Sequence, residues 1–452
     1  MKTMKLRTIF GFILGLMMLS ASLSAQSELK EFESHRDFMN RTVTADSSEY
    51  LARPGNRVHD SAAFEEMRQH ILAMYRGVEI THSFVLDSAH YDCIPVDQQP
   101  ALRNHGIKTI ASPPPQSALA AKSASTSATE TTIKPALQLD PEKPFDQFGN
   151  PVHCEEHTFP MRRITLETMT RFPSLHHFFS KYPDASPQPP GEPAPGAVTD
   201  GHKYAITEQK INNLGGNSSL SVWSPYVNTL LGETFSLAQE WYLGGTFGTS
   251  GLQSEEVGWI VYPGWYQDEK PHLFIYSTPD GYTGDSNYRC WNSVCGNFHF
   301  VPSNVIVGGP LTPSTIGGTQ YELNAQYYLY QGNWWLAING TWIGYYPGSF
   351  YRGGQNSKFA QLIQFGTESV GTYPLWPAEG SGVLSNAGYG YAAYQRDLWY
   401  YNYDTSGTKV WNSLTARQLS SPSCYTISGP YSSSSSGWAR YFYVGGPGGQ
   451  GC

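Results

Sequence analysis

The stretch from His202 to the C-terminus is a succession of short segments rich in β-branched and aromatic residues, separated by turn-forming Gly, Asn and Pro. Helical periodicity is weak here, and each segment has the length of a single strand. The segments are Val257–Tyr262, His272–Tyr276, Phe298–Val301, Gln320–Leu329, Trp334–Asn339 and Thr341–Tyr346. Short strands with turns between them predict an all-β domain, an antiparallel sandwich or barrel.

Acidic side chains are scarce in this stretch, which has only 14 Asp and Glu in 251 residues. Two apolar segments nevertheless carry a carboxylate: Glu255-Glu256-Val257-Gly258-Trp259 and Phe365-Gly366-Thr367-Glu368. Two carboxyl groups brought together by a fold are the minimum equipment for acid–base hydrolysis. Because side chains alternate along a strand, Glu255 and Glu256 are expected on opposite faces, and only one can join such a pair.

Residues 1–25 have the pattern of a secretory signal peptide. A positive start, an apolar run and small residues follow one another, at Lys2–Arg7, Ile9–Met18 and Ser22–Ala25. The apolar run is too short for a membrane span, and no later segment reaches the required length. We therefore expect a soluble, exported protein, secreted or periplasmic, with no membrane contact. A net charge of −8 without a basic cluster makes nucleic acid an unsuitable partner.

Six cysteines fit an exported chain, in which disulfides are the default state. Many pairings of six cysteines exist. Proximity in sequence favours Cys290–Cys295 and Cys424–Cys452, which leaves Cys93–Cys154. The irregular spacing and the absence of a CxxC motif argue against zinc at these cysteines.

Composition divides the chain into a leading part and the β-rich part. A helix is predicted at Ala62–Tyr75, where apolar residues recur at helical spacing. Residues 112–135 are rich in Ser, Ala, Thr and Pro, and residues 183–196 contain six prolines. We interpret both stretches as linkers, the second exposed and semi-extended.

The order of several motifs resembles the neprosin family of secreted glutamic peptidases. Two lie in the leading part, Cys93–Ala101 and the segment from Cys154 to Arg163. The others lie in the β-rich part, at Glu256–Trp259, Cys290–Gly296, Gly332–Trp335, Gly344–Pro347, Phe365–Glu368 and Gly380–Gly382. The family usually has Gly-Gly-Glu where this chain has Gly366-Thr367-Glu368. Thr resists positive φ, so the local turn is a point to check.

The resemblance implies a two-sheet β-sandwich, residues 197–452, preceded by a small mixed α/β activation propeptide, residues 26–196. It implies a monomeric zymogen whose own propeptide is the inhibitor, and cleavage of proline-containing peptides or proteins after proline in acid. The implied catalytic residues are Glu256 and Glu368, with no metal and no cofactor. Two carboxyls that share a water cannot both ionise cheaply, so one serves as base and the other as acid.

Several alternatives remain open. His153-Cys154-Glu155-Glu156-His157 matches an inverted zinc-peptidase pattern but needs a helix, which Pro151 and Pro160 disfavour. Gly380-Ser381-Gly382 lacks the full serine-nucleophile elbow, and Glu379 before it is a candidate for the wall of a groove. The many Tyr and Trp also fit a polysaccharide-binding sandwich. A glycoside hydrolase would hold its two carboxyls about 5–5.5 or 6.5–9.5 Å apart.

Overall fold

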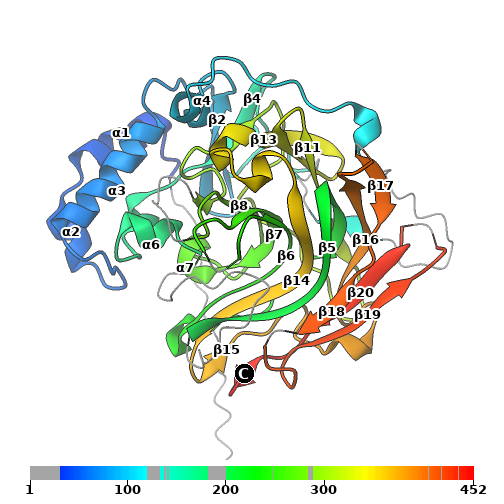
Figure 1. The fold of residues 1–452 in the computed structure, drawn as a ribbon. Coiled ribbons are helices and arrows are strands. Elements are labelled where there is room, and N and C mark those ends of the chain that lie inside the picture. The colour runs from blue at the N-terminus through cyan, green and yellow to red at the C-terminus, as the bar shows by residue number, and fades with distance from the viewer. Residues whose placement is uncertain are drawn as a thin grey trace, which may run out of the picture.

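The computed structural model describes residues 31–119, 133–136, 139, 142–181, 200–247, 249–282, 289–405, 407–418, 420–435 and 437–452. We call the described residues from 31 to 181 the N-terminal region and those from 200 to 452 the β region. Short helices and a small sheet make up the N-terminal region, which packs against a large curled sheet (Figure 1). The signal peptide and the proline-rich stretch 183–196 lie outside the described residues.

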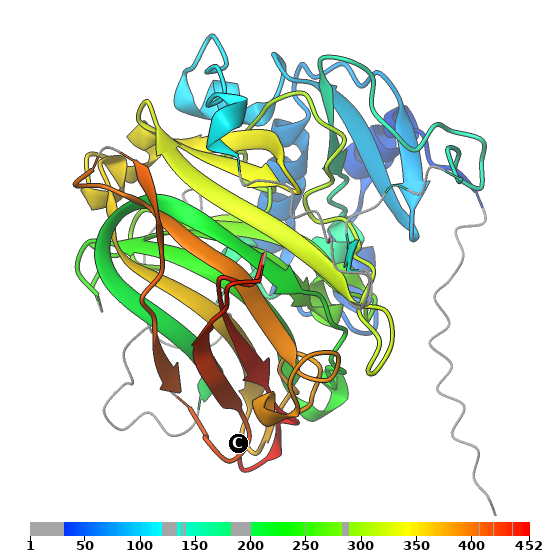
Figure 2. The ribbon, with the colours of Figure 1, turned by 90° about the vertical axis from the view of Figure 1, so that its right-hand side faces the viewer.

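The β region is a sandwich of two layers that share one long curved strand, β5 (Asp200–Ser221), as Figures 1 and 2 show. The N-terminal half of β5 lies between β14 and β18, and its C-terminal half lies between β11 and β16. The first layer runs β18 (Thr415–Gln418), β5, β14 (Ala360–Thr372), β6 (Glu233–Gly244), β7 (Gln253–Val261), β8 (His272–Thr278), β9 (Cys290–Trp291). The second runs β19 (Thr426–Ser432), β20 (Arg440–Gly445), β16 (Ala393–Asn402), β5, β11 (Tyr321–Tyr330), β12 (Asn333–Ile338), β13 (Thr341–Pro347), β10 (His299–Phe300).

This architecture confirms the predicted antiparallel sandwich. Each of the six predicted segments coincides with a strand, namely β7, β8, β10, β11, β12 and β13. Short strands extend the edges: β15 (Leu375–Trp376), β17 (Thr408–Trp411) and β21 (Gly449–Gln450). A two-residue strand, β3 (Lys134–Pro135), pairs in parallel with β11.

The N-terminal region is the expected mixture of helices and a small sheet. Its helices are α1 (His35–Thr44), α2 (Ser47–Ala52), α3 (Ser61–Met74), α4 (Pro100–His105), α5 (Leu166–Met169) and α6 (Leu175–Phe179). The sheet has the order β1 (Ser83–Leu86), β2 (Ala89–Pro95), β4 (Thr158–Arg162). The predicted helix at 62–75 is α3, which begins after Asp60, whose carboxylate accepts from the Ala63 N–H. A buried ion pair between Arg163 and Asp92, at 2.5 Å, ties the end of β4 to β2.

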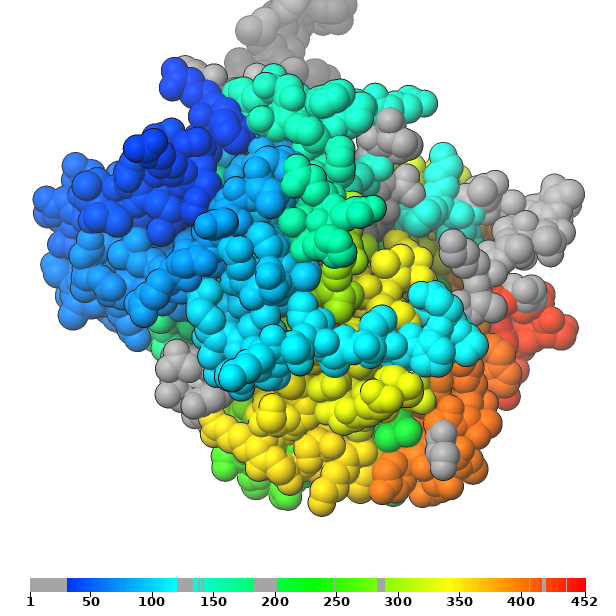
Figure 3. Space-filling view, turned by 90° about the horizontal axis from the view of Figure 1, so that it is seen from above, coloured from blue at the N-terminus to red at the C-terminus, as the bar shows by residue number. Residues whose placement is uncertain are grey.

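The two regions meet along a broad junction, over which the N-terminal residues spread in Figure 3. The Gln99 side chain completes the edge of β10 by donating to the Phe300 carbonyl, at 3.0 Å, and accepting from its N–H, at 2.6 Å. Phe159 stacks on the same Phe300 at 4.2 Å. The described ends of the 112–135 stretch also lie on the β region, because the Ala118 carbonyl accepts from Gln326 and β3 pairs with β11.

All three predicted disulfides are present: Cys93–Cys154, Cys290–Cys295 and Cys424–Cys452. The first joins β2 to the loop before β4, and the last closes the C-terminus onto the segment before β19. Among the described residues, no helix combines the length and the apolar character that a membrane span requires.

Candidate active site

Glu256 and Glu368 lie on one face of the first layer. They come from β7 and β14, which flank β6 on either side, and their register partners on β6 are Trp241 and Leu237. Register partners point to the same face of a sheet, so both glutamates share a face with Gln239. The reverse face looks into the sandwich, where Tyr242 packs on rings of the second layer. The outer face, with the two glutamates, is covered by the N-terminal region.

The Lys181 ammonium group lies between the two carboxyls. Its Nζ is 2.7 Å from Oε2 of Glu256 and 2.7 Å from Oε2 of Glu368, and all three side chains are fully buried. The two oxygens are therefore no farther apart than twice 2.7 Å. A water molecule in the place of Nζ would be within hydrogen-bond distance of both carboxyls. The structure thus brings the two sequence-predicted glutamates together around a space of the size of one water.

Glu256 has three further partners. Its Oε2 accepts from Gln239 at 3.0 Å, and its Oε1 accepts from Ser254 at 2.8 Å and Tyr282 at 2.6 Å. These donors belong to the β region, so they hold the carboxylate whether or not Lys181 is present. Hydrogen bonds to a carboxylate favour its charged form.

Glu368 depends more strongly on charge. Its Oε1 accepts a hydrogen bond of 2.6 Å from Nδ1 of His202, at the start of β5. Burial alone raises the pKa of Glu368, but the attraction of Lys181 and the hydrogen bond from His202 outweigh burial, so this pKa lies below its ordinary value. Burial lowers the pKa of His202, which keeps the ring neutral and its Nδ1–H directed at Glu368.

Lys181 is the second residue after α6 and the last described residue before the proline-rich stretch. Burial opposes its charge, yet the attraction of the two glutamates raises the pKa of Lys181 above its ordinary value. Its ammonium also lies 5.5 Å from the centre of the Trp241 ring and 6.0 Å from that of Tyr276. A buried lysine in this setting is held by charge, not only by packing.

Glu255 lies on the opposite face from Glu256, as strand alternation predicts. It is fully buried and accepts from Nδ2 of Asn356 at 2.8 Å. Without a cation beside it, burial raises the pKa of Glu255 well above its ordinary value, so the group is a neutral acid at neutral pH. Glu255 therefore belongs to the interior of the sandwich and not to the Glu256–Glu368 site.

The expectation that Glu379 lines the groove is wrong. Its carboxyl is fully buried behind Glu368 and accepts from the hydroxyls of Thr367, at 2.6 Å, and Ser369, at 2.8 Å. Thr367 and Ser369 flank Glu368 on β14, so their side chains point to the reverse face. Thr367 has no positive φ, so replacing the usual second Gly leaves the strand regular.

The other sequence motifs lie away from this site. The segment from His153 to His157 forms a turn with both histidines exposed, so the helix that a zinc pattern needs is not formed. Within the residues that the structure describes, no three His, Cys, Asp or Glu are placed to hold a metal ion. The Ser381 hydroxyl accepts from the Val383 N–H, at 3.2 Å, within a loop.

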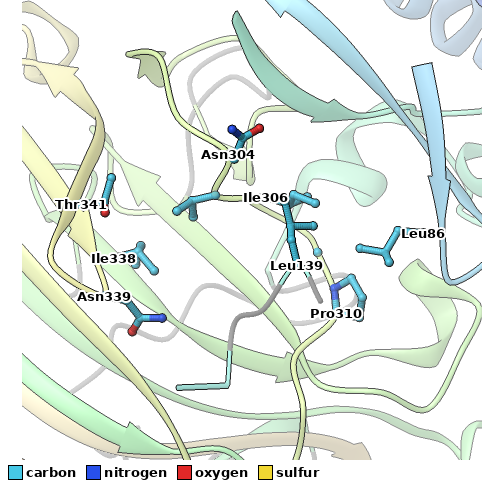
Figure 4. A pocket seen from close by; sticks show the side chains of 10 residues that line it. Leu86, Leu139, Asn304, Ile306, Pro310, Ile338, Asn339 and Thr341 are labelled. Carbon is cyan, nitrogen blue, oxygen red and sulfur yellow. The ribbon is translucent and has the colours of Figure 1, made fainter. Parts of the chain in front are cut away.

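A cavity of about 300 Å³ opens where the small sheet meets the β12–β13 hairpin (Figure 4). Its lining is mainly apolar and includes Leu86, Leu139, Ile306, Pro310 and Ile338, with Leu86 and Ile338 at opposite ends in this view. None of the residues around the glutamate pair lines it. The cavity is therefore separate from the candidate site.

Sequence analysis did not find Lys181, His202, Gln239 and Tyr282. None of them stands in a recognisable motif, and all four lie outside the segments singled out as strands. The available signal was position, since Lys181 lies two residues before the proline-rich stretch 183–196 and His202 lies six residues after it. Only the fold shows that both reach the same carboxyl.

Residues 232–447 match the family model named Neprosin, and the match includes both Glu256 and Glu368. The fold and the match agree with the resemblance found in the sequence, so residues 232–447 form a domain of the neprosin family. This membership indicates a peptidase-type function.

Proposed function

We propose that the chain is an exported glutamic endopeptidase, made as a zymogen, that cleaves peptide bonds after proline in acid. The observation that carries the proposal is the convergence of the Glu256 and Glu368 carboxyls on one buried space. Three disulfides are typical of an oxidising, extracellular compartment and support export.

The proposed chemistry begins when Lys181 leaves and a water takes its place. Without the ammonium, Glu368 loses its main source of charge stabilisation, and burial raises its pKa. Glu256 keeps its three hydrogen-bond donors, which are Gln239, Ser254 and Tyr282. We therefore assign the base to Glu256 and the acid to Glu368.

In the hydrolysis step, Glu256 takes a proton from the water while the water oxygen forms a bond to the substrate carbonyl carbon. Glu368 then gives its proton to the amide nitrogen, and the carbon–nitrogen bond breaks. The products are a carboxylic acid and an amine, and a proton passing from Glu256 to Glu368 restores the starting state. Chain residues alone hold and move each proton in this scheme.

The N-terminal region is proposed to be the inhibitor, with Lys181 as the group that blocks the pair. The ammonium occupies the place that the reacting water needs. Because Lys181 precedes residues 183–196, a cut in that stretch leaves Lys181 on the N-terminal piece. That piece stays bound by its contacts until acid weakens them, so cutting and release are separate steps.

Acid release follows from the direction of the Glu368 pKa. This pKa is lowered in the blocked state, so the Lys181–Glu368 contact stabilises that state fully above the raised pKa that Glu368 has after release. The stabilisation is lost as pH falls from that value through the lowered pKa. Falling pH therefore loosens the block and favours activity.

Proline-containing substrates are proposed because the chain offers one of its own. Residues 183–196 contain six prolines next to the blocked site, although they lie outside the described residues. The full-length protein is expected to shorten in acid to a fragment that starts between Asp184 and Gly196. Cleavage of a proline-containing peptide should appear together with this fragment.

The test compares full-length protein with its Glu368→Gln variant at low pH, by mass spectrometry and with a proline-containing reporter peptide. Gln keeps the shape of the side chain and removes its titrating proton, so the variant should stay intact and inactive. Thermal unfolding confirms that the variant is folded. Equally fast shortening of both proteins, without added protease, would refute self-processing by this site.

The glycoside hydrolase alternative is weaker. The closest carboxyl oxygens are within twice 2.7 Å, shorter than the roughly 6.5–9.5 Å of inverting enzymes and compatible only with the retaining spacing. The segment that occupies the site is a peptide, Phe179-Ser180-Lys181, which favours peptide substrates. Incubation with soluble polysaccharides beside the peptide assay separates the two functions.

A further inference from the structure

The N-terminal region reaches the glutamate pair with a short stretch of main chain, and two contacts of this stretch are made by aromatic side chains of the β region. The Ser180 carbonyl accepts a hydrogen bond from Nε1 of Trp291, at 3.3 Å. Two residues earlier, the Phe178 ring lies parallel to the ring of Trp265, with an interplanar angle of 9° and centroids 5.5 Å apart. Figure 1 shows α6, which carries Phe178, beside α7 (Pro263–Tyr266), which carries Trp265.

Trp291 is held in place by a cage of rings. Its neighbours are Phe235, Tyr262, Phe274 and Tyr276, with centroids 5.1–5.9 Å away. Tyr276 is the register partner of both Trp291 and Glu256, so Trp291 lies two strands from Glu256, on the same face of the sheet. The donor is therefore fixed next to the site before any peptide binds.

Trp265 is covered mainly by the N-terminal region. Phe178 stacks on it, and the guanidinium of Arg162 lies 6.0 Å from its centroid. Within the β region its ring neighbour is Tyr266, at 4.6 Å. When the N-terminal region leaves, the face of Trp265 that Phe178 covers becomes exposed.

We propose that Trp291 and Trp265 form a substrate subsite for extended peptides, on the N-terminal side of the bond that is cut. Trp291 donates to a main-chain carbonyl and positions every peptide in the same way, whatever its side chains. Trp265 takes an aromatic side chain two residues before that carbonyl, in the place where Phe178 now lies. This inference rests on the proposed peptidase function and adds a preference to it, an aromatic residue upstream of proline.

The indole N–H of Trp291 fixes the register of the bound peptide. A buried donor without an acceptor costs free energy, and every peptide offers a main-chain carbonyl as the acceptor. The ring face gives selectivity, because parallel aromatic rings gain free energy beyond the area they bury. The two residues should therefore have separable effects. Loss of the Trp291 donor weakens all substrates alike, whereas loss of the Trp265 ring removes the preference for aromatic peptides only.

The experiment uses acid-activated protein and a peptide series with a single proline, in which Phe or Ala is placed in turn at each upstream position. The wild type should cut peptides with Phe at one upstream position with a kcat/KM about tenfold higher than the Ala peptides. Trp265→Leu should reduce this ratio to near one, because kcat/KM falls for the Phe peptides. Trp291→Phe should raise KM about tenfold for both peptides and keep the ratio.

Trp376→Phe is the matched control, because Nε1 of Trp376 also donates to a main-chain carbonyl, that of Gly201, but outside the site. It should leave KM and the ratio unchanged. The peptide series with the wild-type protein shows whether the preference for an upstream aromatic residue exists, even if a variant fails to fold. Failure of the wild type to cut any peptide would defeat the proposed function. Cutting without an upstream preference, or a preference that survives Trp265→Leu, would overturn the subsite alone.

Discussion

The two faces of the first layer carry buried carboxyls in opposite electrostatic states. On the outer face, Lys181 and His202 hold Glu368 as a carboxylate with a lowered pKa. On the face that looks into the sandwich, burial raises the pKa values of Glu240, Glu255 and Glu379. All of these side chains are fully buried, so burial alone does not distinguish them. A cation within ion-pair distance decides which face carries charge.

This comparison shows what the N-terminal region contributes. The β region alone surrounds Glu256 with neutral donors, whereas the only ammonium described at the pair comes from the other region, with Lys181. Removing that cation makes the outer pair resemble the interior carboxyls, with at least one proton bound. Release of the N-terminal region thus has two effects. It vacates the position between the two carboxyls for a water molecule, and it leaves one carboxyl protonated as the acid that hydrolysis needs.

The largest expected effect contrasts two neighbouring residues on β7. Glu256→Gln should lower kcat at least ~10³-fold, because it removes the proposed base. Glu255→Gln should change kcat less than about threefold, because Gln resembles the neutral acid already present in the interior. Turnover of a proline-containing peptide by the two acid-treated variants checks the contrast. Comparable losses of kcat in the two variants would mean that catalysis does not depend on the outer-face carboxyl of Glu256 in particular.

The second effect concerns the cation. Lys181→Met should weaken the hold of the N-terminal region by roughly 3–5 kcal/mol, the usual effect of breaking a buried ion pair. Activity should then appear at a higher pH and without a lag. The measurement is reporter-peptide cleavage against pH for the full-length protein.

Lys203→Met is the control for that variant, since Lys203 is the register partner of Ser369 on the reverse face of the first layer. Its ammonium lies over the Trp376 ring, at 4.3 Å. The substitution removes a lysine of the β region without touching the glutamate pair and should keep the wild-type lag. An unchanged lag in Lys181→Met would mean that other contacts of the junction block the site.

The third effect tests the junction away from the pair. His105 of α4 and His299 of β10 face each other, with ring nitrogens 2.6 Å apart. Burial and the neighbouring ring lower the pKa of His299 to about 3, and burial lowers that of His105. Both groups are thus neutral when the regions are joined, and the contact loses stability as pH falls from the ordinary value of 6.5.

His105→Asn should therefore make release of the N-terminal region less dependent on pH between about 6 and 3. The background for this measurement is Glu368→Gln, which prevents self-cleavage, and a cut introduced in residues 183–196 allows dissociation to be followed by size-exclusion chromatography. His82→Asn is a control, because His82 lies within the N-terminal region, near Glu155. An unchanged pH profile in His105→Asn would mean that the His105–His299 contact does not contribute to acid release.

The sequence predicted six strands from runs of β-branched and aromatic residues and missed several others, among them β5, β6, β14 and β16. β5 is 22 residues long and bends between layers at Gly215 and Gly216, so it lacks a single buried face and its pattern is mixed. The two glutamates could be found because charge is scarce around them. Lys181 could not, since a lysine before a proline-rich stretch is ordinarily solvated, and only tertiary packing shows its burial.

Glu379 illustrates the opposite error. Its place before Gly380-Ser381-Gly382 suggested a flexible loop at the groove, whereas its carboxyl turns inward to the two hydroxyls beside Glu368. Sequence proximity to a glycine-rich loop does not specify the direction of a side chain. The strand alternation that separated Glu255 from Glu256 was the more reliable guide, because it follows from backbone geometry.

The smallest expected effect is that of Glu379→Gln. Burial raises the pKa of Glu379 to about 8, so the wild-type group is neutral in acid and at neutral pH, and Gln resembles it closely. Activity in acid should change less than about threefold, since Glu379 acts only through Thr367 and Ser369 on β14.

Stability provides the sharper readout for this variant. Because the folded-state pKa of Glu379 is raised, the wild type loses stability as pH rises from about 4.5 to about 8, whereas Glu379→Gln has no such term. The variant should therefore gain in midpoint temperature relative to the wild type across that interval, and the two should differ least in acid. Differential scanning calorimetry at a series of pH values measures the trend. The reverse trend would mean that Glu379 is charged in the folded protein. The interior face would then carry a charged carboxyl, as the outer face does.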